Sequence, residues 1–236
     1  MGETKPVLPR RYHRLRDVLN RRQTDLTVLL EDVHKPHNFS AIIRTCDAVG
    51  VFAAHGVYNE GDVPAFSETA KGSEKWVDIH THPDLETAVN HLKAQNFTLY
   101  ATHLTENALD YRTIDYTKPS CILFGAEKWG VSTEAMALVD QAIYIPMLGM
   151  VQSLNVSVAA AVILFEAQRQ RLNAGFYDHS RFEPEVRDRI LFQWTYPNLA
   201  NAYDRAGKPY PPLGEDGTIL TDVDSMEETK PNNHQT

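Results

Sequence analysis

The chain has 236 residues, 42% of them hydrophobic and 23% charged, and its formal net charge is −8. This composition is ordinary for a globular protein, and the absence of any run of about 18 apolar residues excludes a membrane-spanning helix. The opening residues lack the apolar segment of a secretory signal, so we expect a cytoplasmic protein. The length suits one α/β domain with extensions.

The N-terminal region is basic although the whole chain is acidic. Residues 1–44 contain nine basic and five acidic side chains, a local charge of +4. Within them, residues 10–22 (RRYHRLRDVLNRR) predict a short basic helix with an apolar side made of Tyr12, Leu15, Val18 and Leu19. This helix either docks on the rest of the protein or presents its arginines to phosphates, and the pattern fits both alternatives.

Apolar runs alternate with amphipathic stretches through the middle of the chain. Strands are predicted at 26–30, 53–58, 76–80, 97–102, 121–125 and 142–146. Helices are predicted at 38–50, 84–96 and 132–139, and the aperiodic segment 59–73 predicts a mobile loop. This alternation predicts an α/β fold, with a mostly parallel sheet and helices on both faces. Ligands of such sheets bind beyond the carboxyl ends of strands, here in the loops after Leu30, Phe124 and Ile145.

The segment 143–171 (IYIPMLGMVQSLNVSVAAAVILFEAQRQR) predicts a strand, a turn at Gly149 and a long helix with Ser153 as its N-cap. The predicted apolar face of this helix consists of Val158, Ala161, Val162, Phe165 and Leu172. We expect Gln152, Ser153 and Asn155 to be buried between strand and helix, where their polar atoms need partners. Cys46 and Cys121 lack metal-ligand spacing, and we expect two buried thiols.

Two more helices are predicted at 183–194 and 198–207. The last residues are acidic: residues 215–236 hold six carboxylates and one lysine, which predicts a disordered tail. The expected organisation is an N-terminal basic helical extension at 1–25, a main domain at 26–175, a C-terminal helical extension at 176–212 and an acidic tail at 213–236.

Three motifs carry the polar residues of the predicted loops. HNFSAIIRT starts a helix at Asn38 and includes Arg44. FGAEKWG places Gly125, Glu127 and Gly130 after a buried strand, without the glycine spacing of a Walker or dinucleotide-binding loop. QSLNVSVA opens the long helix. Each motif is weakly specific when taken alone.

Together and in this order, the motifs resemble those of the SpoU branch of the knotted (SPOUT) RNA 2′-O-methyltransferases, over about residues 10–211. The similarity is greatest to the members that methylate guanosine-18 in the D-loop of tRNA. The resemblance implies a C-terminal trefoil knot, an exception to the rule that chains do not thread. It also implies S-adenosyl-L-methionine as cofactor, tRNA as the partner, and a homodimer. The apolar face of the long helix is then either part of the dimer interface or a cover for the sheet.

The resemblance assigns roles to individual residues. Catalytic roles are implied for Asn38, Arg44, Glu127, Ser153 and Asn155. The cofactor pocket is implied at Thr102, Gly125, Glu127, Ile145, Ser153 and Leu154. Guanidinium groups engage phosphates in two places, so the expected RNA contacts are the arginines Arg10, Arg11, Arg14, Arg21, Arg22, Arg169 and Arg171.

The chemistry requires a ribose 2′-hydroxyl to lose its proton. The family assigns this step to the arginine that matches Arg44, although a guanidinium is essentially always protonated. Arg44 either accepts the proton in a partly desolvated site or stays charged and stabilises the developing alkoxide. The sequence fits both versions.

Two other functions use the same fold: methylation of ribosomal RNA, and RNA binding without catalysis. A metal enzyme is a weaker alternative. His34 with His37, and His80 with His82, are spaced closely enough to chelate, yet no cysteine or carboxylate cluster completes either pair. We expect no metal.

Overall fold

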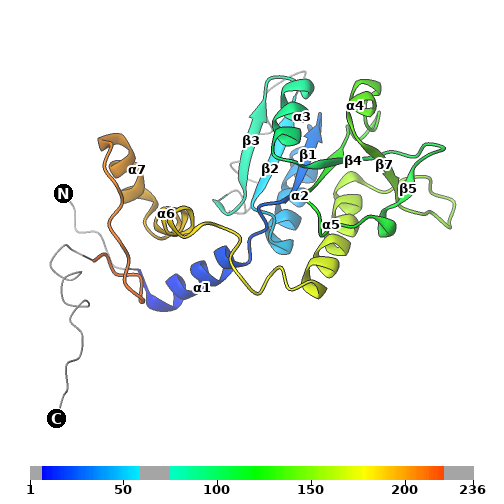
Figure 1. Ribbon diagram of the computed structural model, residues 1–236. Coiled ribbons are helices and arrows are strands. Elements are labelled where there is room, and N and C mark those ends of the chain that lie inside the picture. Colours follow the sequence, from blue (N-terminus) through cyan, green and yellow to red (C-terminus); the bar gives the residue numbers. More distant parts are fainter. Residues whose placement is uncertain (1–6, 59–74, 221–236) are drawn as a thin grey trace, which may run out of the picture. The chain divides into compact units, whose positions relative to one another are not determined.

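The computed structural model describes residues 7–58 and 75–220, whose helices and strands are labelled in Figure 1. The chain divides into two compact units. Of the described residues, 22–58 and 75–179 belong to one unit, and 7–21 and 180–220 belong to the other. The prediction kept the N-terminal and C-terminal extensions apart, whereas the structure joins them in one unit.

The first unit, residues 22–179, is an α/β unit with one sheet. Its described strands are β1 (Leu26–Glu31), β2 (Ala53–Val57), β3 (Asp78–His82), β4 (Thr98–Thr102), β5 (Leu109–Asp110), β6 (Ser120–Phe124) and β7 (Gln141–Tyr144). They are ordered β3-β2-β1-β6-β4-β7-β5, and every neighbouring pair is parallel. This confirms the predicted parallel sheet. Every residue of β1 and β6 is buried, as expected of central strands covered on both faces.

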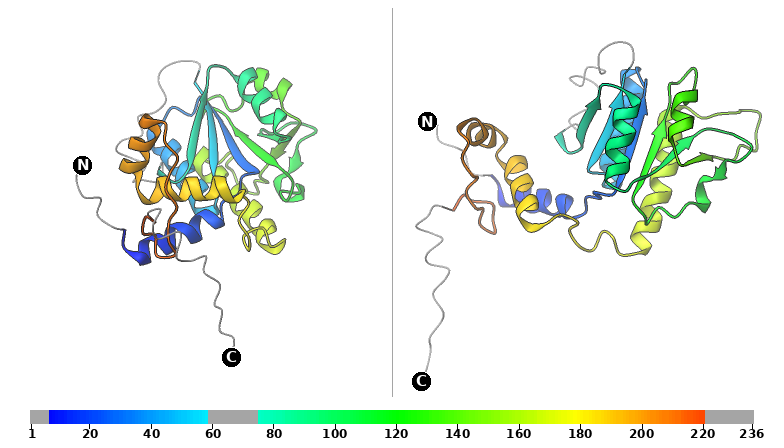
Figure 2. Two further views of the ribbon diagram at one scale, coloured as in Figure 1. Left: turned by 60° about the vertical axis from the view of Figure 1, so that its left-hand side comes forward. Right: turned by 45° about the horizontal axis from the view of Figure 1, so that its top comes forward.

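Helices cover both faces of the sheet, as predicted (Figures 1 and 2). On one face α2 (Pro36–Val49) and α5 (Val156–Asn173) pack against Val28, Leu30, Ile122 and Phe124. On the other face α3 (Leu85–Ala94) and α4 (Thr133–Leu138) pack against Leu29, Cys121 and Leu123. The strand residues alternate between the two cores because successive side chains point to opposite faces. A 3₁₀ turn, η2 (Tyr111–Thr113), follows β5.

The start of α5 differs from the prediction. The helix begins at Val156, and its N-cap is Asn155, whose side chain accepts a hydrogen bond from the Ser157 N–H. Ser153 lies two residues earlier and caps nothing, so its predicted N-cap role is wrong. Gln152, Ser153 and Asn155 are exposed, and the expectation that they are buried is wrong as well. Consecutive polar residues each satisfy the capping pattern, and only the backbone geometry selects one.

The buried face of α5 also differs from the predicted one. Ala160, Ile163, Leu164 and Ala167 face the sheet. The predicted face is largely exposed, with exposed fractions of 47% for Val158, 50% for Phe165 and 54% for Leu172. The first half of α5 is apolar almost all round, so periodicity did not show which side meets the sheet. Of the two alternatives left open above, the structure excludes that this face covers the sheet.

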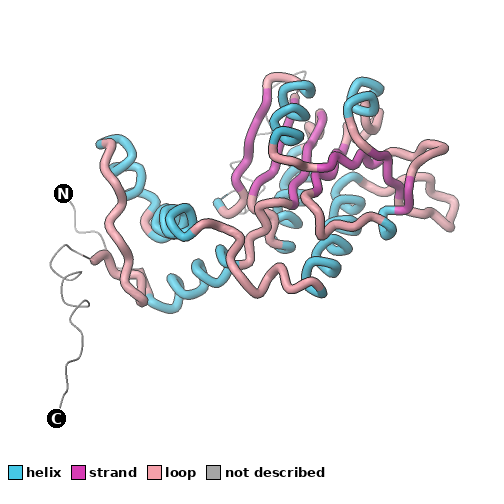
Figure 3. Tube along the Cα trace, viewed as in Figure 1, coloured by secondary structure: helices cyan, strands magenta, loops and turns pink. Residues whose placement is uncertain are grey.

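The second unit contains α1 (Pro9–Asn20), α6 (Pro184–Thr195) and α7 (Pro197–Ala206), drawn as helices in Figure 3. The predicted apolar side of α1 is buried at Tyr12, Leu15 and Leu19. Residues 213–220, predicted as the start of the tail, are packed here. The Tyr196 hydroxyl donates to the Gly217 carbonyl over 2.9 Å. Leu213 pairs with Ile219 and packs with it on an aromatic core built around Phe192.

The remaining predictions on the fold concern the two thiols, a membrane span and two segments outside the described residues. Cys46 and Cys121 are free and buried, as predicted. None of the described helices has the length and apolar character needed to cross a bilayer. The predicted mobile loop at 59–73 and residues 221–236 of the predicted tail lie outside the described residues. The trefoil knot stays a prediction.

Candidate active site

A cavity of about 1210 Å³ opens at the carboxyl ends of β4, β6 and β7. These strands are neighbours in the sheet, so their last residues and the loops that follow meet at one edge. Its lining includes every residue predicted for the cofactor: Thr102, Gly125, Glu127, Ile145, Ser153 and Leu154. All three loops predicted to bind a ligand contribute to its lining: those after β6 and β7 form most of the walls, and the loop after β1 adds Lys35.

The loop after β6 folds back on itself as a tight hairpin. Ala126 and Gly130 form an antiparallel bridge, in which the Gly130 N–H donates to the Ala126 carbonyl over 2.7 Å. A Cβ on Gly125 would lie 2.1 Å from the Gly130 carbonyl oxygen, which no side chain allows. Gly130 has a φ of 70°, in the region that favours glycine. The two glycines of FGAEKWG are therefore needed for this hairpin, which carries Glu127 at the cavity.

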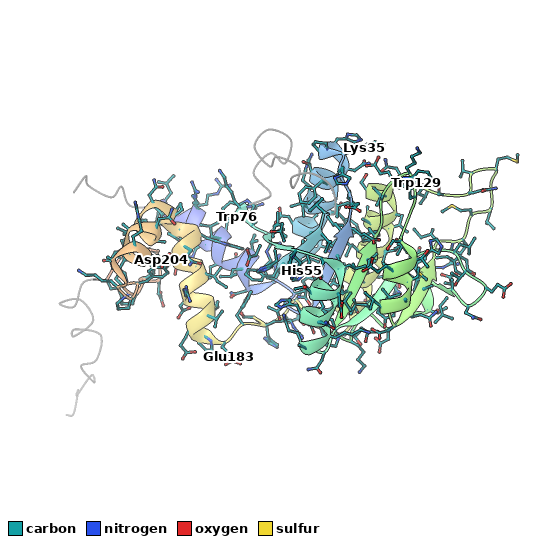
Figure 4. All side chains as sticks on the ribbon, turned by 90° about the horizontal axis from the view of Figure 1, so that it is seen from above. Lys35, His55, Trp76, Trp129, Glu183 and Asp204 are labelled. Atoms are coloured by element: carbon teal, nitrogen blue, oxygen red, sulfur yellow. The ribbon has the colours of Figure 1, made fainter. Side chains whose placement is uncertain are left out.

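A chain of polar side chains connects the three motifs. The Asn155 side-chain N–H₂ donates to the Asn38 oxygen over 3.2 Å, and the Asn38 N–H₂ donates to Glu127. The second Glu127 oxygen is paired with the Lys35 ammonium. Figure 4 labels Lys35, in the loop just before the first motif, and Trp129, in the second motif. Asn38 is buried, so each of its polar atoms needs the partner it has here.

The polar chain shows how predicted catalytic residues are arranged. Asn38, Glu127 and Asn155 come together although they are far apart in the sequence. Ser153 lines the cavity beside them. Arg44 lies elsewhere: it is exposed on α2, outside the cavity lining, and no hydrogen bond or ion pair within the described residues engages its side chain.

The predicted RNA contacts divide into exposed and buried arginines. Arg10, Arg11, Arg14 and Arg21 are exposed at α1. Arg169 is 60% exposed and is paired with Glu166. The other two predictions, Arg22 and Arg171, are wrong because both guanidinium groups are fully buried.

Buried acceptors explain why Arg22 and Arg171 point inward. Arg22 pairs with Asp47 and donates to the Val51 carbonyl. Arg171 pairs with Asp25 over 2.5 Å and donates to the Tyr116 carbonyl over 2.8 Å. A run of basic residues in the sequence does not show which arginine side chains point into the protein and pair with buried carbonyl groups.

Two residues near the cavity, Lys35 and Trp129, were not predicted as site residues. Lys35 pairs with Glu127, and its position three residues before Asn38 was a signal for a cation in this loop. Trp129 is 78% exposed, and the Lys128 ammonium lies 4.5 Å from its ring centroid. A large aromatic residue in an otherwise polar loop was the signal for an exposed ring.

Four histidines gather away from the cavity, at the edge of the sheet. His55 on β2 stacks on His80 and on His82 of β3 with ring centroids 5.2 Å apart, and His91 of α3 lies 5.7 Å away. Burial and the three neighbouring imidazoles lower the pKa of His55 to about 3. Among residues 7–58 and 75–220, no group of three or more His, Cys, Asp or Glu side chains is arranged to hold a metal.

The fold and the cavity define an α/β protein with a cavity at the carboxyl ends of parallel strands, where proteins with such sheets bind their ligands. Comparison with known proteins identifies the family. Residues 25–165 match the SpoU rRNA Methylase family, and residues 169–222 match the SpoU, rRNA methylase, C-terminal family. The chain belongs to the SpoU methylase family.

Individual relatives agree with this assignment. The tRNA (guanosine(18)-2′-O)-methyltransferase of Thermus thermophilus is 66% identical over 184 residues, which cover 78% of this chain and 95% of the relative. The Escherichia coli enzyme with that name is 53% identical and covers 92% and 95%. Among solved structures, the A. aeolicus TrmH/SpoU tRNA modifying enzyme has a TM-score of 0.76 at 43% identity, over 80% of this chain and 97% of that one.

Proposed function

We propose that this protein transfers a methyl group from S-adenosylmethionine to the ribose 2′-hydroxyl of guanosine-18 in the D-loop of tRNA. The polar chain from Asn155 through Asn38 to Glu127 carries the proposal, because it joins the three family motifs beside one cavity. The names of the Thermus thermophilus and Escherichia coli relatives support the choice of substrate. Such an enzyme works where tRNA is processed, which supports a cytoplasmic location.

The cavity suits the cofactor. Its apolar walls include Phe124, Ile145, Leu154 and Ile163, whose side chains provide an apolar surface against which an adenine ring can pack. Backbone groups at the ends of β4, β6 and β7 provide hydrogen-bonding atoms for the base and ribose. A related SpoU methyltransferase, AviRb from Streptomyces viridochromogenes, is 30% identical and has been solved with AdoMet. When bound, the cofactor supplies an electrophilic methyl group on a sulfonium.

The chain's own side chains orient the acceptor ribose. Asn38 is held from both sides by Glu127 and Asn155, so its amide cannot rotate. Glu127 is held in turn by Lys35. A guanidinium is a strong charged hydrogen-bond donor, and we assign to Arg44 the stabilisation of the oxygen that becomes negative as the hydroxyl proton passes to solvent water. Alignment of the hydroxyl with the methyl group supplies much of the acceleration.

A second copy of the chain accounts for two features of this unit. The exposed apolar side chains Val158, Phe165 and Leu172 form a stripe on α5, the kind of surface that marks an interface. Arg44 lies on the neighbouring helix, α2, outside its own cavity. In the proposed homodimer this stripe packs against the partner subunit, and Arg44 serves a site bordered by both subunits.

Phosphate contacts are proposed at the exposed arginines of α1 and at Arg169. Binding through arginine and phosphate releases counterions, so the affinity for tRNA falls steeply with salt. Arg22 and Arg171 are left out because they are buried.

Transfer of labelled methyl groups from S-adenosylmethionine tests the proposal. Unmodified tRNA transcripts and a ribosomal RNA fragment are offered in parallel reactions, and a tRNA with guanosine-18 replaced by adenosine serves as the control. We expect label in the wild-type tRNA alone. Label in ribosomal RNA alone supports the ribosomal alternative, and label in none of the three supports an RNA-binding protein without catalysis.

A further inference from the structure

A buried carboxylate touches the cavity loop from outside the three motifs. Glu31 is the last residue of β1 and is 4% exposed. One of its oxygens accepts the Ser132 backbone N–H over 3.0 Å, and the other accepts the Ser132 hydroxyl over 2.5 Å. A buried carboxylate needs such donors, since it has lost its hydration. Within the described residues these are the partners of the Glu31 side chain.

Ser132 stands where the cavity loop ends. The hairpin that carries Glu127 is closed between Ala126 and Gly130, two residues before Ser132. The Ser132 hydroxyl also accepts the Ala135 N–H over 3.0 Å, as the N-cap of α4. One hydroxyl thus joins the loop, the start of α4 and the end of β1.

The loop that leads to the first motif leaves β1 at the residue after Glu31. The chain turns at Asp32, which has a φ of 52° and whose N–H donates to the Val57 carbonyl over 3.0 Å. It then runs to Lys35 and Asn38, the two residues that hold Glu127. Glu31 therefore lies directly before the loop that carries Lys35, and its carboxylate accepts hydrogen bonds from Ser132, at the end of the loop that carries Glu127. The neighbouring strands are already in register, with Leu30 opposite Phe124.

We propose that Glu31 and Ser132 are positioning residues, which hold the hairpin at 125–131 against the cofactor cavity so that Glu127 meets Asn38. Neither residue lines the cavity, so both act through the loop. The inference rests on the proposed function for its catalytic consequence. Its structural consequence, a loop that opens when the contact is cut, does not depend on the substrate.

Glu31→Gln is the test variant because it keeps the shape and replaces one accepting oxygen with an N–H₂ group. Loss of a hydrogen bond to a charged group corresponds to about a tenfold change. We expect KM for S-adenosylmethionine to rise about tenfold, with KM for tRNA within about twofold of wild type. Ser132→Ala should give the same change, and Ser132→Thr, which keeps the hydroxyl, should restore wild-type values. The double variant Glu31→Gln, Ser132→Ala should be no worse than either single change.

Asp84→Ala is the matched control. Asp84 is the N-cap of α3 and accepts the Thr87 N–H over 2.7 Å, so the variant also removes a cap, but outside the cavity lining. We expect it to lower Tm and leave KM for S-adenosylmethionine unchanged. If Glu31→Gln behaves in the same way, Glu31 has a structural role only and the proposal is overturned.

Amide hydrogen exchange provides a readout without activity. Exchange at residues 126–132 should accelerate at least tenfold in Glu31→Gln and stay at the wild-type rate in Asp84→Ala. Wild-type exchange in the Glu31→Gln hairpin overturns the inference. A wild-type protein that transfers no methyl group to tRNA overturns the proposed function instead, and the exchange experiment still decides the role of Glu31.

Discussion

Replacement of Arg171 separates a structural arginine from an RNA contact. Its guanidinium is fully buried and donates to at least five acceptors: the Gln23 side chain, the Asp25 carboxylate and the backbone carbonyls of Asp25, Tyr116 and Lys118. These acceptors come from two segments that α5 must hold together. Arg171→Ala leaves the Asp25 carboxylate and four other oxygens without this donor.

The expected cost is large. Removing one partner of a buried ion pair destabilises a protein by about 3–5 kcal/mol, against a total stability of about 5–15 kcal/mol. Arg171→Lys keeps the charge, but its three donors on one nitrogen cannot satisfy five separated acceptors. We expect a loss of about 2 kcal/mol from the lysine variant.

Urea unfolding followed by circular dichroism measures these losses, with Arg169→Ala as the control. Arg169 is two residues away on the same helix, is exposed, and has a surface pair with Glu166 that is worth less than about 1 kcal/mol. Arg169→Ala is a control for stability only. If Arg171→Lys is as stable as Arg169→Ala, but binds tRNA more weakly than the wild-type protein and with a smaller salt slope, Arg171 contacts RNA and its structural assignment is refuted.

Three further predictions concern pH, catalysis and RNA binding. Burial and the neighbouring His80, His82 and His91 lower the pKa of His55 from 6.5 to about 3, so the unfolded chain takes up a proton below pH 6.5 that the folded chain refuses. The free energy of unfolding is therefore constant above pH 6.5 and falls between pH 6.5 and 3, by about 2 kcal/mol at pH 5. His55→Gln should reduce this loss in urea titrations at pH 8 and pH 5. An unchanged loss would show that His55 is not its cause. Arg44→Ala should lower kcat by about 10²–10³ with Tm and cofactor affinity unchanged in calorimetry, and near-wild-type turnover would remove Arg44 from the site. Exchange of Arg11 and Arg14 for Gln should weaken tRNA binding and reduce the salt slope by about 2 in filter binding, whereas an unaltered slope would show that α1 does not contact RNA.

Much of the fold was predictable because local patterns agree with the tertiary structure. The central strands β1 and β6 are mostly apolar on both of their faces, the pattern of strands in a sheet covered on both faces. The motif order brought Asn38, Glu127 and Asn155 into one predicted site, and the structure joins them by hydrogen bonds.

The failures have a common physical cause, since each depends on which neighbour a side chain meets. The predicted apolar face of α5 is exposed in the structure. The prediction chose the wrong face because the first half of the helix is apolar on several sides. Arg22 and Arg171 match the basic pattern of an RNA contact, yet buried acceptors draw both inward. The contact of Glu31 with Ser132 joins residues 101 positions apart, a separation at which no local pattern operates.

Mapping of the methylated ribose tests the central claim most directly. An unmodified tRNA transcript is incubated with the protein and labelled S-adenosylmethionine, and the modified nucleotide is located by digestion and mass spectrometry. We predict one 2′-O-methylguanosine, at position 18 in the D-loop, which forms at least about a hundredfold more slowly when Arg44→Ala replaces the wild-type protein. Methylation at any other ribose, or of the base, contradicts the proposed function.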